Sequence, residues 1–128
     1  MTDRTILVVD DEPMIRDLFR RFFEQAGYSV QTAESAEEAL EMVRETPIWV
    51  LFLDLNLPGM NGVELCRQIR RSWPMAIPYA VTGYASLFEL SSCREAGFED
   101  YFTKPVNLDD LLQAAENAFG KLERWKER

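Results

Sequence analysis

The chain has 128 residues, of which 47% are apolar and 28% are charged, as is typical of one compact domain. Its formal charge of −8, from 22 acidic and 14 basic residues, argues against direct nucleic-acid binding, which needs an excess of Lys and Arg. The absence of histidine excludes the most common general base and metal ligand, and any phosphohistidine carrier within this chain.

Short apolar runs alternate with segments of helical periodicity, which indicates an α/β fold with a parallel sheet. Continuous apolarity in the first and third runs predicts central strands that are covered on both faces. Five strand–helix units follow, without a linker, repeat or low-complexity segment inside them. The predicted strands are residues 5–9, 28–33, 48–53, 77–81 and 100–103.

Helical spacing and capping signals place a helix after each strand, and Gly27 and Gly97 stand where the first and fourth helices should end. Apolar residues three and four apart predict inward-facing stripes, namely Ile15, Leu18, Phe19, Phe22 and Ala26 in the first helix and Ala36, Ala39, Leu40 and Val43 in the second. Predicted helix starts are Ser35 with Glu38, Asn61 with Glu64, Ser86 with Glu89, and Asn107 with Asp110.

The last helix is predicted over residues 108–126, and its apolar stripe continues to Trp125. Trp125 either marks a helix that continues toward a partner or a second domain, or is a packed residue at the helix end. No run of about 18 apolar residues could span a membrane, and the charged segment at 10–12 comes too early for a secretory signal peptide. We therefore expect a cytoplasmic chain, in which Cys66 and Cys93 are reduced core residues.

Polar residues stand at the ends of four predicted strands. The carboxyl ends of parallel strands lie along one edge of a sheet, where ligands bind. Three carboxylates in one crevice repel one another by about 4 kcal/mol per pair at roughly 4 Å and an effective dielectric of about 20. A lysine and a hard cation such as Mg²⁺ would offset this charge. The residues in question are Asp10, Asp11, Asp54, Thr82 and Lys104.

Each of these residues also has an ordinary structural interpretation. Asp11 suits the N-terminus of the helix that Pro13 begins, and Asp54 could start a turn. Thr82 could belong to a common turn with the glycine that follows it. Such independent explanations would have to coincide at the same end of four strands, so a shared site is favoured.

At this combination the sequence resembles the receiver domain of two-component response regulators. The resemblance rests on VVDDEP at 8–13, LDLNLPGMNG at 53–62, AVTGYAS at 80–86 and AGFEDYFTKPVNLDDL at 96–111. It implies a single receiver domain over residues 1–128, with a doubly wound, flavodoxin-like parallel sheet of five strands in the order 2-1-3-4-5 and five helices.

The resemblance also implies a set of site residues. Asp54 would accept the phosphoryl group. Mg²⁺, for which Mn²⁺ could substitute, would be bound by Asp11 directly, by Asp10 through water, and by Asp54 and the backbone carbonyl of Asn56. Residues that would complete the site are Thr82 and Lys104, which would contact phosphoryl oxygens, and Pro105, whose preceding peptide bond is expected to be cis.

The function implied is a signalling switch rather than an enzyme, since it would catalyse only its own phosphorylation and slow dephosphorylation. The donor would be a sensor histidine kinase or a histidine phosphotransfer protein. Thr82 would move toward the phosphate and Tyr101 would turn inward, which would change the surface of the fourth helix, fifth strand and fifth helix. Formation of a homodimer on phosphorylation is common in the family. We further hypothesise that Tyr84, next to the site, impedes the access of water and so slows hydrolysis of the acyl phosphate. The downstream target or output domain is not readable from the sequence.

Two other classes fit less well. A magnesium-dependent phosphatase would carry a D-x-D signature after the first strand and a cap domain, and a flavodoxin-like FMN carrier would need a Ser-, Thr- and Gly-rich loop where this chain has DDEPM. The remaining alternative is a receiver-like binding module that works without phosphorylation. Receiver-like modules that have lost phosphorylation usually lack one of the acids, the lysine or the threonine. Because all of these residues are present here, a site active in phosphorylation is favoured.

Overall fold

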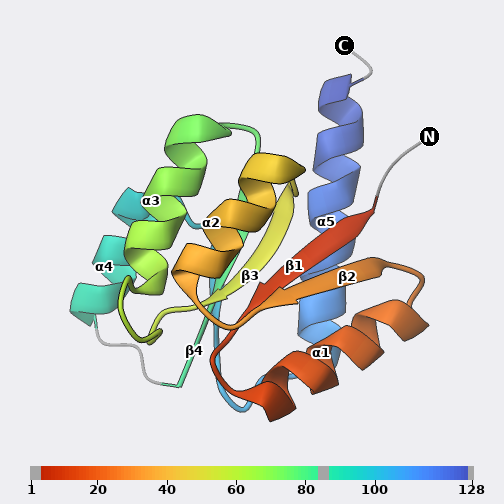
Figure 1. The fold of residues 1–128 in the computed structure, drawn as a ribbon. Coiled ribbons are helices and arrows are strands. Elements are labelled where there is room, and N and C mark those ends of the chain that lie inside the picture. Colours follow the sequence, from red (N-terminus) through yellow and green to blue (C-terminus); the bar gives the residue numbers. More distant parts are fainter. Residues whose placement is uncertain (1–3, 84–86, 127–128) are drawn as a thin grey trace.

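The structure is a computed structural model that describes residues 4–83 and 87–126 (Figure 1). Its strands form one parallel sheet in the order β2-β1-β3-β4-β5, which confirms the predicted topology. The strands are β1 Thr5–Val9, β2 Ser29–Ala33, β3 Val50–Asp54, β4 Ile77–Thr82 and β5 Asp100–Thr103. The helices are α1 Pro13–Gln25, α2 Ala36–Glu45, α3 Gly62–Ser72, α4 Leu87–Ala96 and α5 Leu108–Lys126.

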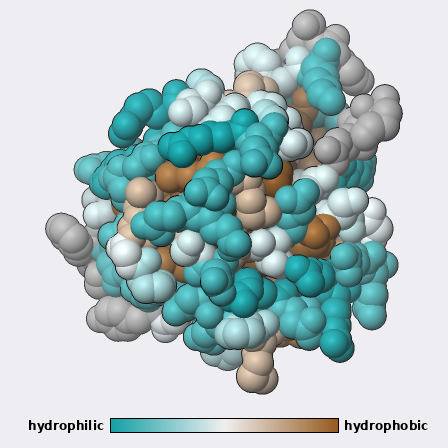
Figure 2. Space-filling model, viewed as in Figure 1, coloured by the Kyte–Doolittle hydropathy of each residue, from teal (hydrophilic) through white to brown (hydrophobic). Residues whose placement is uncertain are grey.

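The sheet separates two helical layers, with α1 and α5 on one face and α2, α3 and α4 on the other (Figure 1). Side chains alternate along each strand, so that Leu51 enters the core under α2 and α3 while Phe52 enters the core under α1 and α5. The surface in the same view is mostly hydrophilic, with apolar side chains visible only in small patches (Figure 2). Among the described residues, no helix has both the length and the hydrophobicity needed to cross a membrane.

Several helix boundaries follow the predicted caps. The Ser35 hydroxyl accepts a hydrogen bond from the Glu38 backbone N–H at 3.1 Å, and the Asn61 side chain accepts one from the Glu64 N–H at 2.9 Å. At the start of α5, Asn107 instead accepts from the N–H of Asp109, one residue earlier than expected. Gly27 and Gly97 have φ of 100° and 103°, the left-handed conformation expected after a helix. Ser86, the remaining predicted cap, lies outside the described residues.

The predicted apolar stripe of α1 was partly wrong. Phe23 is fully buried, whereas Leu18 is 46% exposed and Ala26 is also exposed. The ring of Phe23 packs on Phe52 of β3 at a centroid distance of 5.1 Å. Apolar residues spaced three and four apart predict that a helix has an apolar face, but not which residue lies at the middle of that face. Packing against the sheet decides this. The stripe of α2 is buried as predicted.

Two strands differ from their predicted limits in a way that matters for the site. β3 begins two residues later than expected and includes Asp54 as its last residue, and β4 extends to Thr82. Both polar residues therefore belong to the sheet rather than to the loops after it. The predicted limits of β1, β5 and α5 agree with the structure, and Cys66 and Cys93 are buried and unbridged as expected.

Candidate functional site

The winding of the sheet brings the predicted polar residues to one edge. Asp10 follows β1, Asp54 and Thr82 end β3 and β4, and Lys104 follows β5. The register places Asp54 opposite Val81, so these strand ends are level with one another. The expected convergence is confirmed, and the strand ends form one crevice.

Three carboxylates meet in this crevice. One oxygen each from Asp10, Asp11 and Asp54 can be chosen so that all three lie within 4.8 Å of one another. Asp10 and Asp54 are buried and Asp11 is exposed. A donor set of carboxylate oxygens with one open side fits a hard cation such as Mg²⁺, which binds through a few carboxylates and keeps several waters.

Lys104 is the cation that faces these acids. Its ammonium lies 2.9 Å from Oδ2 of Asp10 and 3.6 Å from Oδ2 of Asp54. Burial lowers the pKa of Lys104, but the hydrogen bond and charge of Asp10, with the charge of Asp54, outweigh it and raise the pKa overall. The Lys104–Pro105 peptide bond is cis, as the resemblance implied.

Asp54 is held by its own loop. Its Oδ1 accepts a hydrogen bond from the Asn56 backbone N–H at 3.0 Å. Burial raises the pKa of the Asp54 carboxyl, and the charges of Asp10 and Asp11 raise it further, while the Asn56 N–H and Lys104 act in the opposite direction. The net direction is upward, so ionised Asp54 is under-compensated by the protein groups around it.

Gly62 at the start of α3 allows the close approach of this helix to Asp54. Its N–H donates to the Leu55 carbonyl at 3.2 Å, and a Cβ at position 62 would collide with the carbonyl oxygen of Asp54. The loop between them is also fixed from α2, where the Glu37 carboxylate accepts a hydrogen bond from the Met60 N–H at 3.3 Å. The sequence did not predict these roles of Gly62 and Glu37, because neither a glycine nor a glutamate indicates by itself which backbone segment it will contact.

Arg16 of α1 is a third residue that sequence reasoning missed. Its guanidinium donates to the backbone carbonyl oxygen of Asp10 at 2.8 Å. The only signal available was a basic residue one turn into the helix after the acidic pair, and surface helices commonly carry such residues. Asp10 is further held by the Glu12 N–H, which donates to its Oδ1 at 2.9 Å.

The two residues expected to act as a switch lie on neighbouring strands. Thr82 is fully buried, whereas Tyr101 is 43% exposed and pairs with Ala80 across the sheet. Tyr101 therefore has its side chain at the surface in this structure. Tyr84, which we expected to influence hydrolysis, lies outside the described residues.

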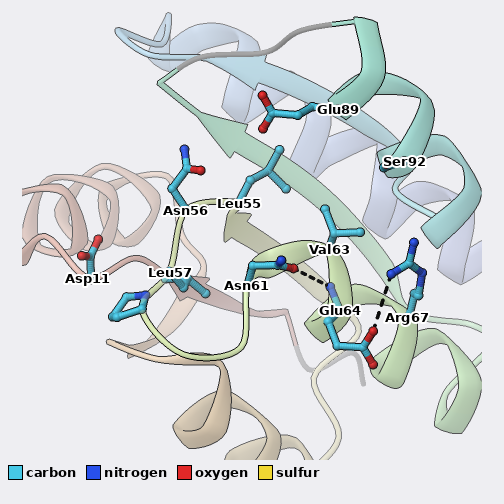
Figure 3. A pocket seen from close by; sticks show the side chains of 11 residues that line it. Asp11, Leu55, Asn56, Leu57, Asn61, Val63, Glu64, Arg67, Glu89 and Ser92 are labelled. Carbon is cyan, nitrogen blue, oxygen red and sulfur yellow. Dashed lines mark hydrogen bonds and ion pairs between the residues drawn. The ribbon is translucent and has the colours of Figure 1, made fainter.

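A groove of about 730 Å³ opens beside the acidic crevice. Asp11 and Asn56 lie at one side of it, Ser92 of α4 lies at the opposite side, and Glu64 and Arg67 of α3 lie below Ser92 in this view (Figure 3). Of the three acids only Asp11 lines this groove, whereas Asp10 and Asp54 are buried.

Comparison with known proteins gives a consistent result. A sequence model of the response regulator receiver domain matches residues 6–116. Response regulator MprA of Mycobacterium leprae is 38% identical over 107 residues, which cover 84% of this chain and 47% of that protein. A cyclic di-GMP phosphodiesterase of Thermotoga maritima is 34% identical over 107 residues, again 84% of this chain but 28% of that protein.

Solved structures agree with the sequence comparison. A CheY-like response regulator receiver domain protein from Methanospirillum hungatei superposes with a TM-score of 0.92 at 33% identity, over 96% of this chain and 98% of that one. The chain spans less than half the length of the curated relatives described above. From the family match, the fold and the identities, we conclude that this chain belongs to the response regulator receiver domain family.

Proposed function

We propose that this chain is a phosphorylation-activated switch in which Asp54 accepts a phosphoryl group from the phosphohistidine of a sensor histidine kinase or histidine phosphotransfer protein. The observation that carries the proposal is the meeting of Asp10, Asp11 and Asp54 around one point, with the Lys104 ammonium beside two of them. This arrangement would place a nucleophilic carboxylate, a cation site and a fixed positive charge within one crevice.

In the proposed reaction, the bond from phosphorus to the histidine nitrogen breaks and a bond from phosphorus to an Asp54 carboxylate oxygen forms. The electron pair of the broken bond stays on the nitrogen, so no oxidant or reductant is needed. Phosphoryl transfer depends mainly on alignment and on neutralisation of the equatorial oxygens. Lys104 would neutralise one oxygen, and Thr82 would donate a hydrogen bond to another.

Asp11, Asp10, Asp54 and the Asn56 carbonyl would hold Mg²⁺, for which Mn²⁺ would substitute. The bound cation would contribute charge neutralisation during transfer. The Asn56 N–H, which fixes Oδ1 of Asp54, orients the nucleophile before the donor arrives. Arrangement of the carboxylate in advance reduces the reorganisation that the transfer requires.

The output would be a change at the surface formed by α4, β5 and α5. Thr82 would move toward the phosphoryl group, and the exposed Tyr101 would then fill the vacated space.

We also propose that residues 1–128 are one receiver domain that acts in the cytoplasm and does not itself bind nucleic acid or a membrane. It would signal to a separate target or an attached output domain, and phosphorylation could bring two copies together. The phosphodiesterase name belongs to a whole relative, of which this chain matches 28%.

The test is to incubate the chain with acetyl phosphate and Mg²⁺ and to measure its mass. We expect the mass to increase by one phosphoryl group, and we expect no increase in Asp54→Asn or after chelation of Mg²⁺. Asp17→Asn, which changes an exposed aspartate of α1, is the matched control and should react normally. If acetyl phosphate and several donor proteins phosphorylated on histidine all leave the mass of the unsubstituted chain unchanged, the chain is instead a binding module that works without phosphorylation.

The switch needs its own measurement. In protein labelled with fluorotyrosine, the ¹⁹F resonance of Tyr101 should shift when beryllofluoride and Mg²⁺ are added. This resonance is assigned as the one that is missing from the spectrum of Tyr101→Phe. A Tyr101 resonance that does not respond would rule out Tyr101 as the switch residue, even if Asp54 is phosphorylated. Gel filtration of the same samples tests the dimer.

A further inference from the structure

We propose that Arg16 is a positioning residue that holds the acidic pair in place for the cation, an inference that rests on the function proposed above. Its guanidinium donates a hydrogen bond of 2.8 Å to the carbonyl oxygen of Asp10. This carbonyl belongs to the peptide unit that joins Asp10 to Asp11. Only 19% of the Arg16 side chain is exposed, so the contact is shielded from solvent.

The two acids depend on this peptide unit to different degrees. The carboxylate of Asp10 is held on both sides, because Oδ1 accepts from the Glu12 N–H and Oδ2 from the Lys104 ammonium. The Asp11 carboxylate is exposed, and within residues 4–83 and 87–126 it makes no hydrogen bond or ion pair. Without such a contact, the position of Asp11 relative to Asp54 depends on the backbone of Asp11. The Arg16 hydrogen bond restrains this backbone at the peptide unit between the two acids.

The second contact of Arg16 is weaker. Its guanidinium lies 3.8 Å from the carboxylate of Glu34, a side chain that is 70% exposed. Exposed ion pairs are screened by water and salt and contribute little. The hydrogen bond to the Asp10 carbonyl is consequently the contact that matters, and Glu34→Gln should leave cation binding unchanged.

Charge and positioning predict opposite effects for the loss of Arg16. If the side chain acted only as a positive charge near the acids, its removal would strengthen the binding of a divalent cation. If it acts by holding the peptide, its removal frees Asp11 and weakens cation binding. The sign of the change in affinity therefore distinguishes the two roles.

The experiment measures Mn²⁺ affinity by electron paramagnetic resonance of the free ion. Arg16→Met should raise the dissociation constant about tenfold, at the lower end of the 10–100-fold losses found for residues that orient metal ligands. Arg20→Met is the matched control, because Arg20 is also on α1 and its guanidinium also donates a hydrogen bond of 2.8 Å, but to the Thr32 hydroxyl of β2 rather than to Asp10. It should change the constant less than about twofold, in the range expected for surface residues.

Amide hydrogen exchange in the metal-free protein gives a second readout. Exchange at the Glu12 N–H, which donates to Oδ1 of Asp10, should become faster in Arg16→Met and remain unchanged in Arg20→Met. If Arg16→Met does not fold, Arg16→Lys carries the test, because it keeps the charge but replaces the planar guanidinium with a more strongly hydrated ammonium on a flexible stem, and it should still bind Mn²⁺ more weakly. Unchanged or tighter Mn²⁺ binding in the folded Arg16 variant would overturn the inference. A parent chain that neither binds Mn²⁺ nor becomes phosphorylated would overturn the proposed function instead.

Discussion

Lys104 forms an ion pair of 2.9 Å with Asp10, although the two residues are 94 positions apart and follow strands that are not neighbours. β3 and β4 lie between β1 and β5 in the sheet. The lysine side chain therefore reaches across the end of β3, above the residue proposed as the phosphoryl acceptor. This pair neutralises part of the charge of the crevice before a cation binds.

The first prediction concerns this pair. Lys104→Met leaves clustered carboxylates without their ammonium, so the free energy of unfolding in EDTA should fall by about 2 kcal/mol. This is less than the roughly 3–5 kcal/mol lost when a fully buried pair is broken, because Lys104 remains partly exposed. Excess Mg²⁺ should restore more stability in the variant than in the parent. Urea titrations followed by circular dichroism measure both effects.

The control for Lys104 is Lys121→Met. Lys121 pairs with Glu99 at 3.3 Å, but both side chains are more than one third exposed. Such a pair contributes little, so this variant should unfold close to the parent midpoint. Equal losses in the two lysine variants would show that the crevice has no special need for Lys104.

The second prediction concerns Asp54 in the absence of a cation. Because burial raises the pKa of its carboxyl, the folded chain holds this proton more tightly than the unfolded chain does. Stability is then lost as the pH rises through the raised pKa, and at neutral pH the ionised group lowers the free energy of unfolding. Asp54→Asn should therefore be more stable than the parent in EDTA and gain less from Mg²⁺. A less stable Asp54→Asn variant would contradict this account of the crevice.

The third prediction concerns the contact between α3 and β3. Gly62→Ala places a methyl group against the Asp54 carbonyl, and such overpacking typically costs about 1–3 kcal/mol. Gly120→Ala in α5 is the matched change, because among the described residues the nearest neighbour of its Cβ beyond its own helix backbone would be the Arg124 guanidinium, at 3.5 Å. That variant should be more stable by up to about 1 kcal/mol, from helix propensity. Urea midpoints that move in the same direction for both variants would refute the proposed close approach.

The fourth prediction concerns alkaline pH. Burial raises the pKa of the Cys66 thiol to about 12 from 9.0, and its Sγ lies 3.4 Å from the Ala96 carbonyl oxygen. Burial also raises the pKa of the Tyr79 hydroxyl, which donates to the Ala114 carbonyl at 2.9 Å. Folding therefore favours both protonated forms, and stability is present below the unfolded pKa values and lost as the pH rises through the folded ones.

Urea unfolding measured at several pH values between about 9 and 12 should show this loss. Cys66→Ala removes the thiol and should make the pH dependence shallower, although it also leaves a small cavity that lowers stability at every pH. A thiol reagent at neutral pH should modify Cys66 only after unfolding, since the native thiol is buried and protonated. Rapid modification of native Cys66 would contradict the burial.

Local patterns were enough to predict much of this fold. The limits of β1, β5 and α5, the caps at Ser35 and Asn61, and the buried stripe of α2 depend on residues within about one or two turns of each other. Backbone conformation and amphipathic periodicity act over the same short range. The alternation of strands and helices also restricted the topology, because parallel crossovers are right-handed and place every strand end on one edge.

Other features depended on tertiary contacts. Packing against Phe52 decided that Phe23 rather than Leu18 faces the core, and the folded chain alone brings the Arg16 guanidinium to the Asp10 carbonyl. The sequence by itself determined which elements form and which acids reach the edge, because those depend on neighbouring residues. Only the tertiary structure decided which partners those acids acquire, because a hydrogen bond or an ion pair requires distances near 3 Å between groups that the sequence keeps far apart.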